Sequence, residues 1–259
     1  MHSGNEQSQS LQGRTAIVTG SGQNIGRAIA LAYARNGANV VINGHSNLET
    51  IEAVAAEARA LGVKAIAVRA DVGDSEAVEQ MVERTANELG SVDIVVSNVS
   101  VRHHQPFLDI SVEDWNQIIN SNLSASFYLA KFAIPHMIKR GWGRVINISG
   151  RDGFFPKINR AHNVTCKAGV FALAKAIAVE FGQVGITANA IAPGIIETTR
   201  DPVHYPNFEK EYEARRQAMP VRRLGTTDDI AESCLYLCSQ AGGFVTGQIL
   251  HVNGGEFMA

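Results

Sequence analysis

Long apolar runs, an excess of one charge and abundant cysteine are all missing from this chain. No apolar stretch approaches the roughly 20 residues that a membrane-spanning helix needs, so we expect no transmembrane segment. Charged residues make up 19% of the 259 residues and give a formal net charge of −2. They form neither a basic stripe nor an acidic run, which argues against nucleic acid or a membrane surface as a partner.

Cysteine occurs only at Cys166, Cys234 and Cys238. An odd number of cysteines, together with a polar segment over residues 1–10 in place of an apolar signal, predicts reduced thiols and a cytoplasmic location. Cys234 and Cys238 are one helical turn apart, but no second cysteine or histidine pair lies near them in the sequence. We therefore expect them to pack in the core, no metal site, and a flexible N-terminal tail over 1–10.

Short apolar runs alternate with longer amphipathic segments along most of the chain. The runs cover residues 15–20, 39–43, 64–72, 93–98, 144–149, 187–193 and 248–255. This alternation predicts one α/β domain over residues 11–259, a doubly wound parallel sheet of about seven strands flanked by helices, which is the Rossmann arrangement. The segment 195–225 breaks the rhythm with three prolines and many charges. We interpret it as a lid over a pocket; the alternative is a surface segment that is exposed to solvent and covers no pocket.

A glycine-rich turn follows the first predicted strand and opens the first predicted helix. It consists of Gly20, Ser21, Gly22, Gln23, Asn24, Ile25 and Gly26. Glycines let a backbone approach a pyrophosphate closely, and a helix N-terminus offers free N–H groups and a positive dipole end. The turn therefore predicts a bound dinucleotide; the alternative is a turn that only reverses the chain.

The end of the second predicted strand bears on which dinucleotide binds. An acidic side chain there would hold the ribose hydroxyls and repel a 2′-phosphate, but residues 43–46 contain no carboxylate. His45 and Ser46 could hold a phosphate. NADP(H) is therefore favoured over NAD(H), although His45 can also be read as an ordinary exposed loop residue.

Together these features resemble the short-chain dehydrogenase/reductase family from about residue 11 to 257. The turn is similar to that family's T-G-x-x-x-G-x-G, with Asn24 in place of the middle glycine. The resemblance also covers the segments that contain Asp71, Val72, Asn98, Asn122, Pro193, Gly194, Ile196 and Thr198. It implies that Asp71 and Val72 lie at the adenine, that Ile196 and Thr198 meet the carboxamide and a phosphate, and that Asn122 is the active-site asparagine.

Two residues of the family's catalytic signature are replaced. The family places a serine thirteen residues before a Y-x-x-x-K motif, whose lysine corresponds to Lys167. In that register Asn163 stands at the tyrosine position and Gly150 at the serine position. Ser149 is one place early and would point to the opposite face of a strand. The resemblance thus implies an atypical member whose usual proton donor is absent.

Several residues could still contact a substrate or carry a proton. His162 precedes Asn163 and titrates near neutrality, but neighbours on a helix point about 100° apart, so it can also be structural. His103 and His104 follow the fourth predicted strand. Arg151, after Gly150, could bind a polar or anionic substrate or form a surface ion pair. Lys167 could itself serve as the acid if its pKa were lowered.

Three functions remain open at this point. The first is an NAD(P)(H)-linked oxidoreductase that acts on a small alcohol or carbonyl compound with a rearranged proton donor. The second is a nucleotide-binding pseudoenzyme or sensor, and the third is a non-redox lyase on the same scaffold. Family members commonly form dimers or tetramers through two long helices, here roughly 111–138 and 163–182. A homodimer or homotetramer is therefore expected; burial of these helices within one monomer is the alternative.

Overall fold

The structure, a computed structural model, describes residues 10–199 and 208–258. A seven-stranded parallel sheet forms its centre, with the strand order β3-β2-β1-β4-β5-β6-β7. The strands are β1 (Thr15–Val18), β2 (Asn39–Gly44), β3 (Ala65–Arg69), β4 (Ile94–Ser97), β5 (Gly143–Ile148), β6 (Ile186–Pro193) and β7 (Ile249–Val252). The predicted fold class is confirmed. Most predicted strands continue beyond the observed ones at their C-terminal ends, because those polar residues turn away to build the site.

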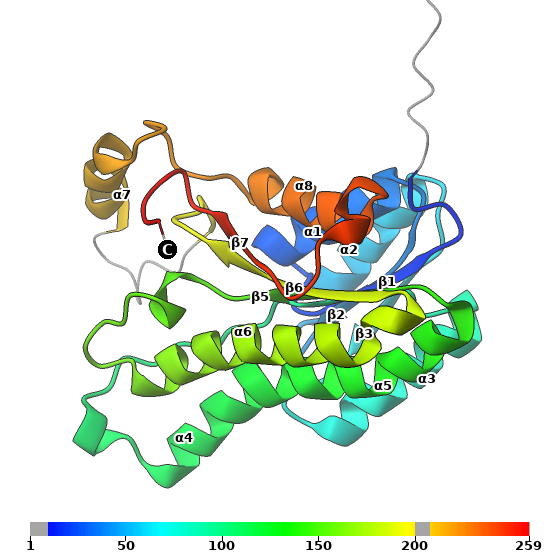
Figure 1. Cartoon of the computed structure of the whole chain (residues 1–259), viewed down its shortest axis with the longest axis horizontal. Helices are drawn as coiled ribbons and strands as arrows, with labels where there is room; N and C mark the ends of the chain where they lie inside the picture. The colour runs from blue at the N-terminus through cyan, green and yellow to red at the C-terminus, as the bar shows by residue number, and fades with distance from the viewer. Residues whose placement is uncertain (1–9, 200–207, 259) are drawn as a thin grey trace, which may run out of the picture.

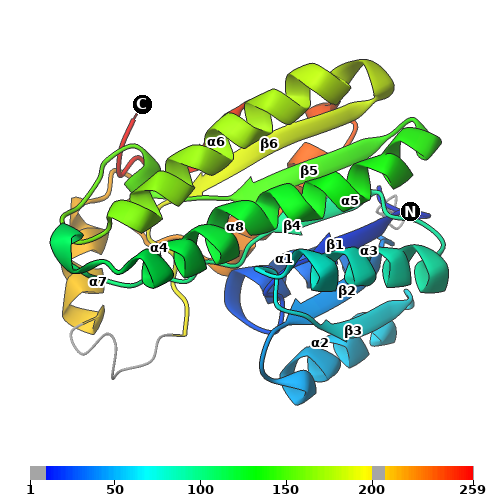
Figure 2. The same cartoon turned by 90° about the horizontal axis from the view of Figure 1, so that it is seen from below.

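Helices cover both faces of the sheet (Figures 1 and 2). One layer contains α1 (Asn24–Arg35), α2 (Leu48–Ala60) and α8 (Thr227–Cys238); the other contains α3 (Ser75–Leu89), α5 (Ala125–Arg140) and α6 (Ala161–Phe181). The helix α4 (Val112–Ile119) continues through a single π-helical turn (Asn120–Ser124) into α5. The interior strands β1, β4, β5 and β6 are buried on both faces, which explains why they read as continuous apolar runs.

The strand order places a switch point between β1 and β4. From β1 the chain runs outward to β3 and then returns to β4 on the other side of β1. In open α/β sheets, ligands bind outside the carboxyl ends of the strands at such a point. The glycine turn after β1 and the loop after β4 lie there, so the fold itself brings the predicted site residues together.

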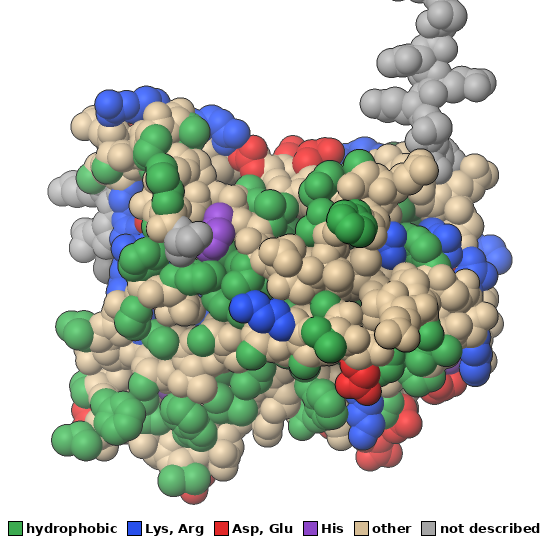
Figure 3. Space-filling view, viewed as in Figure 1, with side chains coloured by type: hydrophobic (Ala, Val, Ile, Leu, Met, Phe, Trp, Pro, Cys, Tyr) green, Lys and Arg blue, Asp and Glu red, His purple; other side chains and the backbone are tan. Residues whose placement is uncertain are grey.

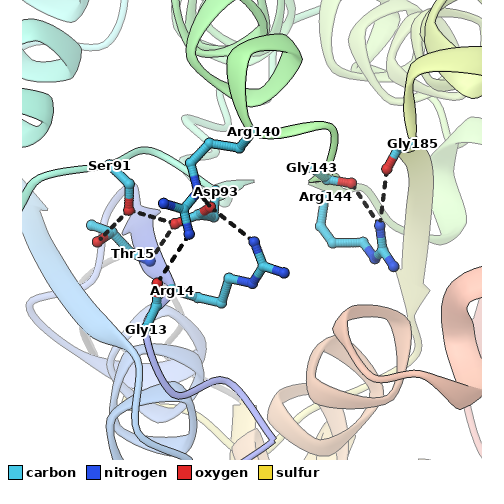
Figure 4. Close-up of polar contacts among 9 residues, drawn as sticks. All are labelled: Gly13, Arg14, Thr15, Ser91, Asp93, Arg140, Gly143, Arg144 and Gly185. Carbon is cyan, nitrogen blue, oxygen red and sulfur yellow. Dashed lines mark hydrogen bonds and ion pairs between the residues drawn. The ribbon is translucent and has the colours of Figure 1, made fainter.

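A polar cluster closes the opposite, N-terminal edge of the sheet (Figure 4). Asp93 is fully buried and accepts hydrogen bonds from the Thr15 backbone N–H at 2.9 Å and the Ser91 hydroxyl at 2.6 Å. Its other oxygen pairs with Arg14 at 3.2 Å and Arg140 at 2.8 Å. A buried carboxylate with this many donors is compensated. The cluster therefore stabilises the strand starts and lies away from the ligand edge.

The segment 195–225 is only partly described. Its first residues run along the cavity, and Ile196 pairs with Gly225 in an isolated parallel bridge. The helix α7 (Phe208–Ala218) occupies its second half, while residues 200–207 lie outside the described residues, as do residues 1–9 of the predicted tail. Within the part of the chain that the structure describes, no helix is long and apolar enough to cross a membrane, and no group of metal-ligating side chains is present.

Candidate functional site

A cavity of about 420 Å³ opens at the carboxyl ends of the strands. Its walls come from the turn at α1, the loop after β4, the segment between β5 and α6, the segment after β6, and α7. Among the predicted residues, the lining includes Ile25, Asn98, Gly150, Arg151, His104, Asn163, Lys167, Pro193, Gly194, Ile196 and Thr198. Residues more than 140 positions apart in the chain thus meet in one cavity.

The glycine turn is held in shape by amide side chains from neighbouring strands. Asn98 donates to the backbone oxygens of Thr19 and Gly20 at 3.0 and 3.2 Å. The Ser21 hydroxyl donates to Val18 O at 2.6 Å and accepts from the Asn43 backbone N–H at 3.0 Å. Ser21 is fully buried, so its hydroxyl supports the turn and does not face the cavity.

The turn has the features that a dinucleotide requires. A Cβ on Gly26 would lie 2.3 Å from Gly20 O, so only glycine permits this close approach of helix and strand. Asn24 adopts φ 49°, a left-handed conformation that Asn tolerates better than most residues. Gln23 caps α1 without a side-chain hydrogen bond, and no acidic residue occupies the first turn. The N–H groups and positive dipole end of α1 therefore remain available to a phosphate.

Asn24 also ties the turn to the segment that follows β6. Its side-chain oxygen accepts from the Thr199 N–H at 2.9 Å, and its side-chain nitrogen donates to Thr199 O at 3.4 Å. Thr198 lies in the cavity wall beside this contact, and Gly194 sits so close to Asn253 that a Cβ would meet its Cα at 2.8 Å. The start of the segment is thereby fixed across the mouth of the turn.

The residues predicted for the adenosine end lie together but outside the cavity lining. His45 and Ser46 are exposed at the end of β2, and His45 Nδ1 is 4.0 Å from Asp71 Oδ2. Val72 is buried beneath Asp71, whose other oxygen accepts from the Gly73 N–H at 2.9 Å. The imidazole and the carboxylate thus share one surface at the edge of the sheet.

Lys167 is held on the floor of the cavity from both ends. Its Nζ donates to Ile148 O at 3.2 Å, and its backbone oxygen accepts from the Ser149 hydroxyl at 2.9 Å. Only 6% of the residue is exposed. Burial, reinforced by the positive charge of Arg102, lowers the pKa of this amine to about 7. An amine with that pKa can both give and take a proton near neutrality.

Asn163 stands one helical turn before Lys167 and is part of a polar chain. Its side-chain nitrogen donates to Asp152 Oδ2 at 2.9 Å, and Arg160 donates to the same oxygen at 2.8 Å. Because the carboxylate accepts, the amide presents its NH2 group to Asp152 and directs its oxygen elsewhere. That oxygen is buried and has no protein partner among the described residues.

Three of the predicted polar residues, His103, His162 and Asn122, lie outside the cavity lining. His162 is fully buried outside the cavity, its Nδ1 accepts from the Asn163 N–H at 2.8 Å, and its ring packs edge-on against His103. Burial, and then the nearby His103, lower the pKa of His162. Asn122 lies in the π-helical turn with both amide groups bonded to the backbone of Val101 at 2.7 Å. It therefore positions the loop after β4.

Sequence reasoning missed the part of the wall that comes from distant or loop positions. These residues are Arg102, Lys157, Arg160, Tyr212, Arg215 and Glu256. Tyr212, from α7, donates its hydroxyl to Ile196 O at 3.2 Å, so a phenol does reach the cavity from elsewhere in the chain. The alternation of charges in 195–225 gave no means of telling which of them turn inward.

Comparisons with known proteins agree with this geometry. A family model described as enoyl-(acyl carrier protein) reductase matches residues 20–256. A curated relative, the 3-oxoacyl-[acyl-carrier-protein] reductase FabG of Aquifex aeolicus (strain VF5), is 36% identical and aligns over 95% of this chain and 98% of its own length. The chain belongs to the short-chain dehydrogenase/reductase family. The family is one of oxidoreductases, as the resemblance in sequence implied.

A second curated relative and a solved structure show that this chain is similar to dehydrogenases with different names. The (2S)-[(R)-hydroxy(phenyl)methyl]succinyl-CoA dehydrogenase subunit BbsD of Thauera aromatica is 36% identical over 95% of this chain and 97% of its own. A solved structure of a gluconate 5-dehydrogenase from Burkholderia cenocepacia J2315, in complex with NADP and tartrate, is 30% identical. It superposes with a TM-score of 0.87 over 96% of this chain and 97% of its own.

Proposed function

We propose that this protein catalyses NADP(H)-linked hydride transfer on a small alcohol or carbonyl compound, with Lys167 as the group that gives or takes the proton. The observation that carries the proposal is the buried amine on the cavity floor, whose pKa lies near 7. It stands beside Asn163, at the position where the family places its tyrosine. The proposal retains the family's oxidoreductase activity and reassigns one role within it.

The chain's own residues account for holding the cofactor. The free N–H groups at the start of α1 would bind the diphosphate. The backbone from Pro193 to Thr198 would bind the carboxamide of the nicotinamide. When bound, the nicotinamide accepts or donates a hydride. The absence of a carboxylate over residues 43–46, with His45 and Ser46 exposed there, supports NADP(H) over NAD(H).

Lys167 has the position and the acidity that the proton transfer needs. In the reducing direction its ammonium would protonate the oxygen of the substrate, and in the oxidising direction its neutral amine would take that proton back. The amide of Asn163 cannot exchange a proton usefully near neutral pH, but its free oxygen can accept a hydrogen bond from a substrate hydroxyl. Asn163 thus orients the group on which Lys167 acts.

Two other assignments compete with this one. Tyr212 places a phenol at the same cavity, although its hydroxyl donates to Ile196 O. A nucleotide-binding pseudoenzyme would share every cofactor contact and lack turnover. A non-redox lyase would leave the glycine turn without a purpose and is the weakest of the alternatives.

We also propose that copies of this chain associate through α5 and α6. Both helices present apolar side chains outward, and Phe127 and Val179 are exposed. Large exposed apolar residues on long neighbouring helices favour a second copy as the cover.

The test combines binding with turnover. Purified protein would be titrated with NADPH and NADH while nicotinamide fluorescence is followed, and then assayed at 340 nm against a panel of alcohols and carbonyl compounds. We expect tighter binding of NADPH and turnover that Lys167→Met abolishes and Tyr212→Phe preserves. Tight binding with no absorbance change for any compound would favour the pseudoenzyme. Loss of turnover in Tyr212→Phe with retention in Lys167→Met would give the proton to the phenol.

A further inference from the structure

The cavity carries many more positive than negative side chains. Besides Lys167, its lining includes the cations Arg102, Arg151, Lys157, Arg160 and Arg215, whereas the carboxylates are Asp152 and Glu256. They come from the loop after β4, the segment between β5 and α6, and α7. In the space-filling view, Lys and Arg side chains also gather at the end of the molecule that carries α7 (Figure 3).

The two carboxylates do not neutralise this wall. Asp152 pairs with Arg160 at 2.8 Å, and Glu256 lies 3.3 Å from Arg215 and 3.9 Å from Arg151. Arg102 and Lys157 have neither an ion pair nor a side-chain hydrogen bond within residues 10–199 and 208–258. Two cations therefore line the cavity without an ion-pair partner among the described residues, although Asp152 acts on Lys157 at longer range.

The positive charges of the wall lower the pKa values of the titratable groups beside them. Burial is the largest cause that lowers the pKa of Lys157, and the charges of Arg215, Arg160 and Arg151 lower it further. The pKa of His104 is lowered by burial and then by Arg160. Cations that depress one another's protonation store a repulsion that an anion would relieve.

The cofactor's diphosphate does not account for these cations. The glycine turn meets a diphosphate with backbone N–H groups and a helix dipole, and none of the five cations belongs to it. Arg151, Lys157 and Arg160 precede Asn163 in the segment between β5 and α6, and Arg215 comes from α7. Arg102 lies in the loop after β4, and its charge acts on Lys167. Their place is therefore the side of the cavity where the reacting oxygen would lie.

We propose that the substrate is an anion, a small hydroxy or oxo compound whose carboxylate or phosphate group binds to Arg102 and Lys157 while its oxygen faces Lys167. The identity of the substrate rests on the proposed function, but the anion site does not. Guanidinium groups match carboxylate and phosphate oxygens in a two-pronged geometry, and an ammonium adds a compact charge. A cavity of about 420 Å³ limits the ligand to a small molecule.

Proton linkage follows from the same arrangement. An anion bound to Arg102 and Lys157 would raise the pKa of Lys157 and of the neighbouring His104, because it favours their charged forms. His104, exposed beside Arg102, faces the positive charges of Arg160 and Lys157 and the negative charge of Asp152. Binding should therefore take up protons near neutral pH and weaken as the pH or the salt concentration rises.

Calorimetry on the whole protein tests the site without relying on turnover. Malate, glycerol 3-phosphate and neutral glycerol would be titrated into the NADP(H)-loaded protein in two buffers of different ionisation enthalpy. The variants are Arg102→Gln with Lys157→Gln, and the control is Lys64→Gln, an exposed lysine before β3. We expect one or both anions to bind with proton uptake, and the double variant to lose about tenfold or more in affinity, while the control and NADPH affinity do not change.

Each other result has a definite meaning. If glycerol binds as tightly as the anions, or if the double variant binds the anions normally, the proposal is wrong. A loss of NADPH affinity in the double variant would assign the cations to the cofactor and also overturn it. Preference for malate or for glycerol 3-phosphate distinguishes a carboxylate from a phosphate. Anion binding without turnover on any substrate would retain the anion site and reject the proposed function.

Discussion

The side-chain nitrogen of Asn163 donates a hydrogen bond to Asp152 Oδ2 at 2.9 Å, and Arg160 donates to the same oxygen. This contact determines which way the amide points and leaves its oxygen buried without a protein partner among the described residues. An oxygen of that kind favours a ligand hydroxyl as its donor. Asn163 therefore presents an oriented amide one helical turn before Lys167.

The pH dependence of the rate should follow Lys167. With a pKa of about 7, the ammonium is present below that pH, so kcat/KM for reduction should be level at low pH and fall up to about tenfold per unit above it. Oxidation should show the opposite slope. Lys167→Arg keeps a positive charge but cannot lose its proton, so its profile should be lower and flat. An unchanged profile in that variant would mean that another group carries the proton.

Stability should also depend on this amine. The folded pKa of about 7 lies below the ordinary value of 10.5, so between these values the unfolded chain binds more protons. The free energy of unfolding should therefore rise with pH by about 1.4 kcal/mol per unit in that window, and level off below it. Urea unfolding from pH 7.5 to 9.5 should show this slope in the native protein. Lys167→Met should show a smaller slope, whatever its absolute stability; equal slopes would contradict the assigned pKa.

Gly26→Ala should damage the phosphate turn selectively. The added Cβ would lie 2.3 Å from Gly20 O and 2.8 Å from Ser21 Cα, both of them backbone atoms that cannot swing away. We expect a loss of stability of about 1–3 kcal/mol and a large fall in NADPH affinity, measured by thermal unfolding and fluorescence. Gly182→Ala is the matched control, because a Cβ there meets nothing within 4 Å and its φ is −59°. A Gly26→Ala protein that binds NADPH normally would remove the turn from the cofactor site.

The resemblance aligns Gly150 with the family's serine and Asn163 with its tyrosine, and introducing those two side chains tests whether the native residues have a role. Gly150 has extended backbone angles and open space around a built Cβ, so Gly150→Ser should fold normally. Combined with Asn163→Tyr, it should lower the native activity by at least about tenfold if Asn163 orients the substrate. Turnover measured at 340 nm decides the matter, with Gly150→Ser alone as the control. An activity that appears only in the double variant would identify the native centre as a degenerate one.

The order of strands and helices could be predicted because the interior strands of the parallel sheet are buried on both faces. Such strands read as apolar runs, and the helices between them carry a period that the sequence displays directly. The glycine turn could be placed for the same reason, since its residues are contiguous. Lys167 and Asn163 were singled out by the resemblance to the family's Y-x-x-x-K motif, and both lie on α6.

The cationic wall could not be predicted, because its parts meet only through the tertiary fold. Arg102 and Lys157 sit in loops with no periodicity, and Arg215 comes from α7, nearly fifty residues beyond Lys167. His162 lies next to Asn163 in the chain, yet it is buried against His103 outside the cavity lining, which fits the structural alternative. The signal that could have helped was a surplus of arginine and lysine in the segments that follow β4 and β5.

Two adjacent residues of one strand end hold Lys167, since Ile148 accepts from its amine and the Ser149 hydroxyl donates to its backbone oxygen. A lysine side chain ordinarily samples many rotamers, and immobilising it is among the larger entropic penalties of any residue. Here that penalty falls on folding and does not recur when a ligand binds. The amine is therefore held in one position at the end of β5, and a ligand has only to replace its hydrogen bond to Ile148 O in order to contact it.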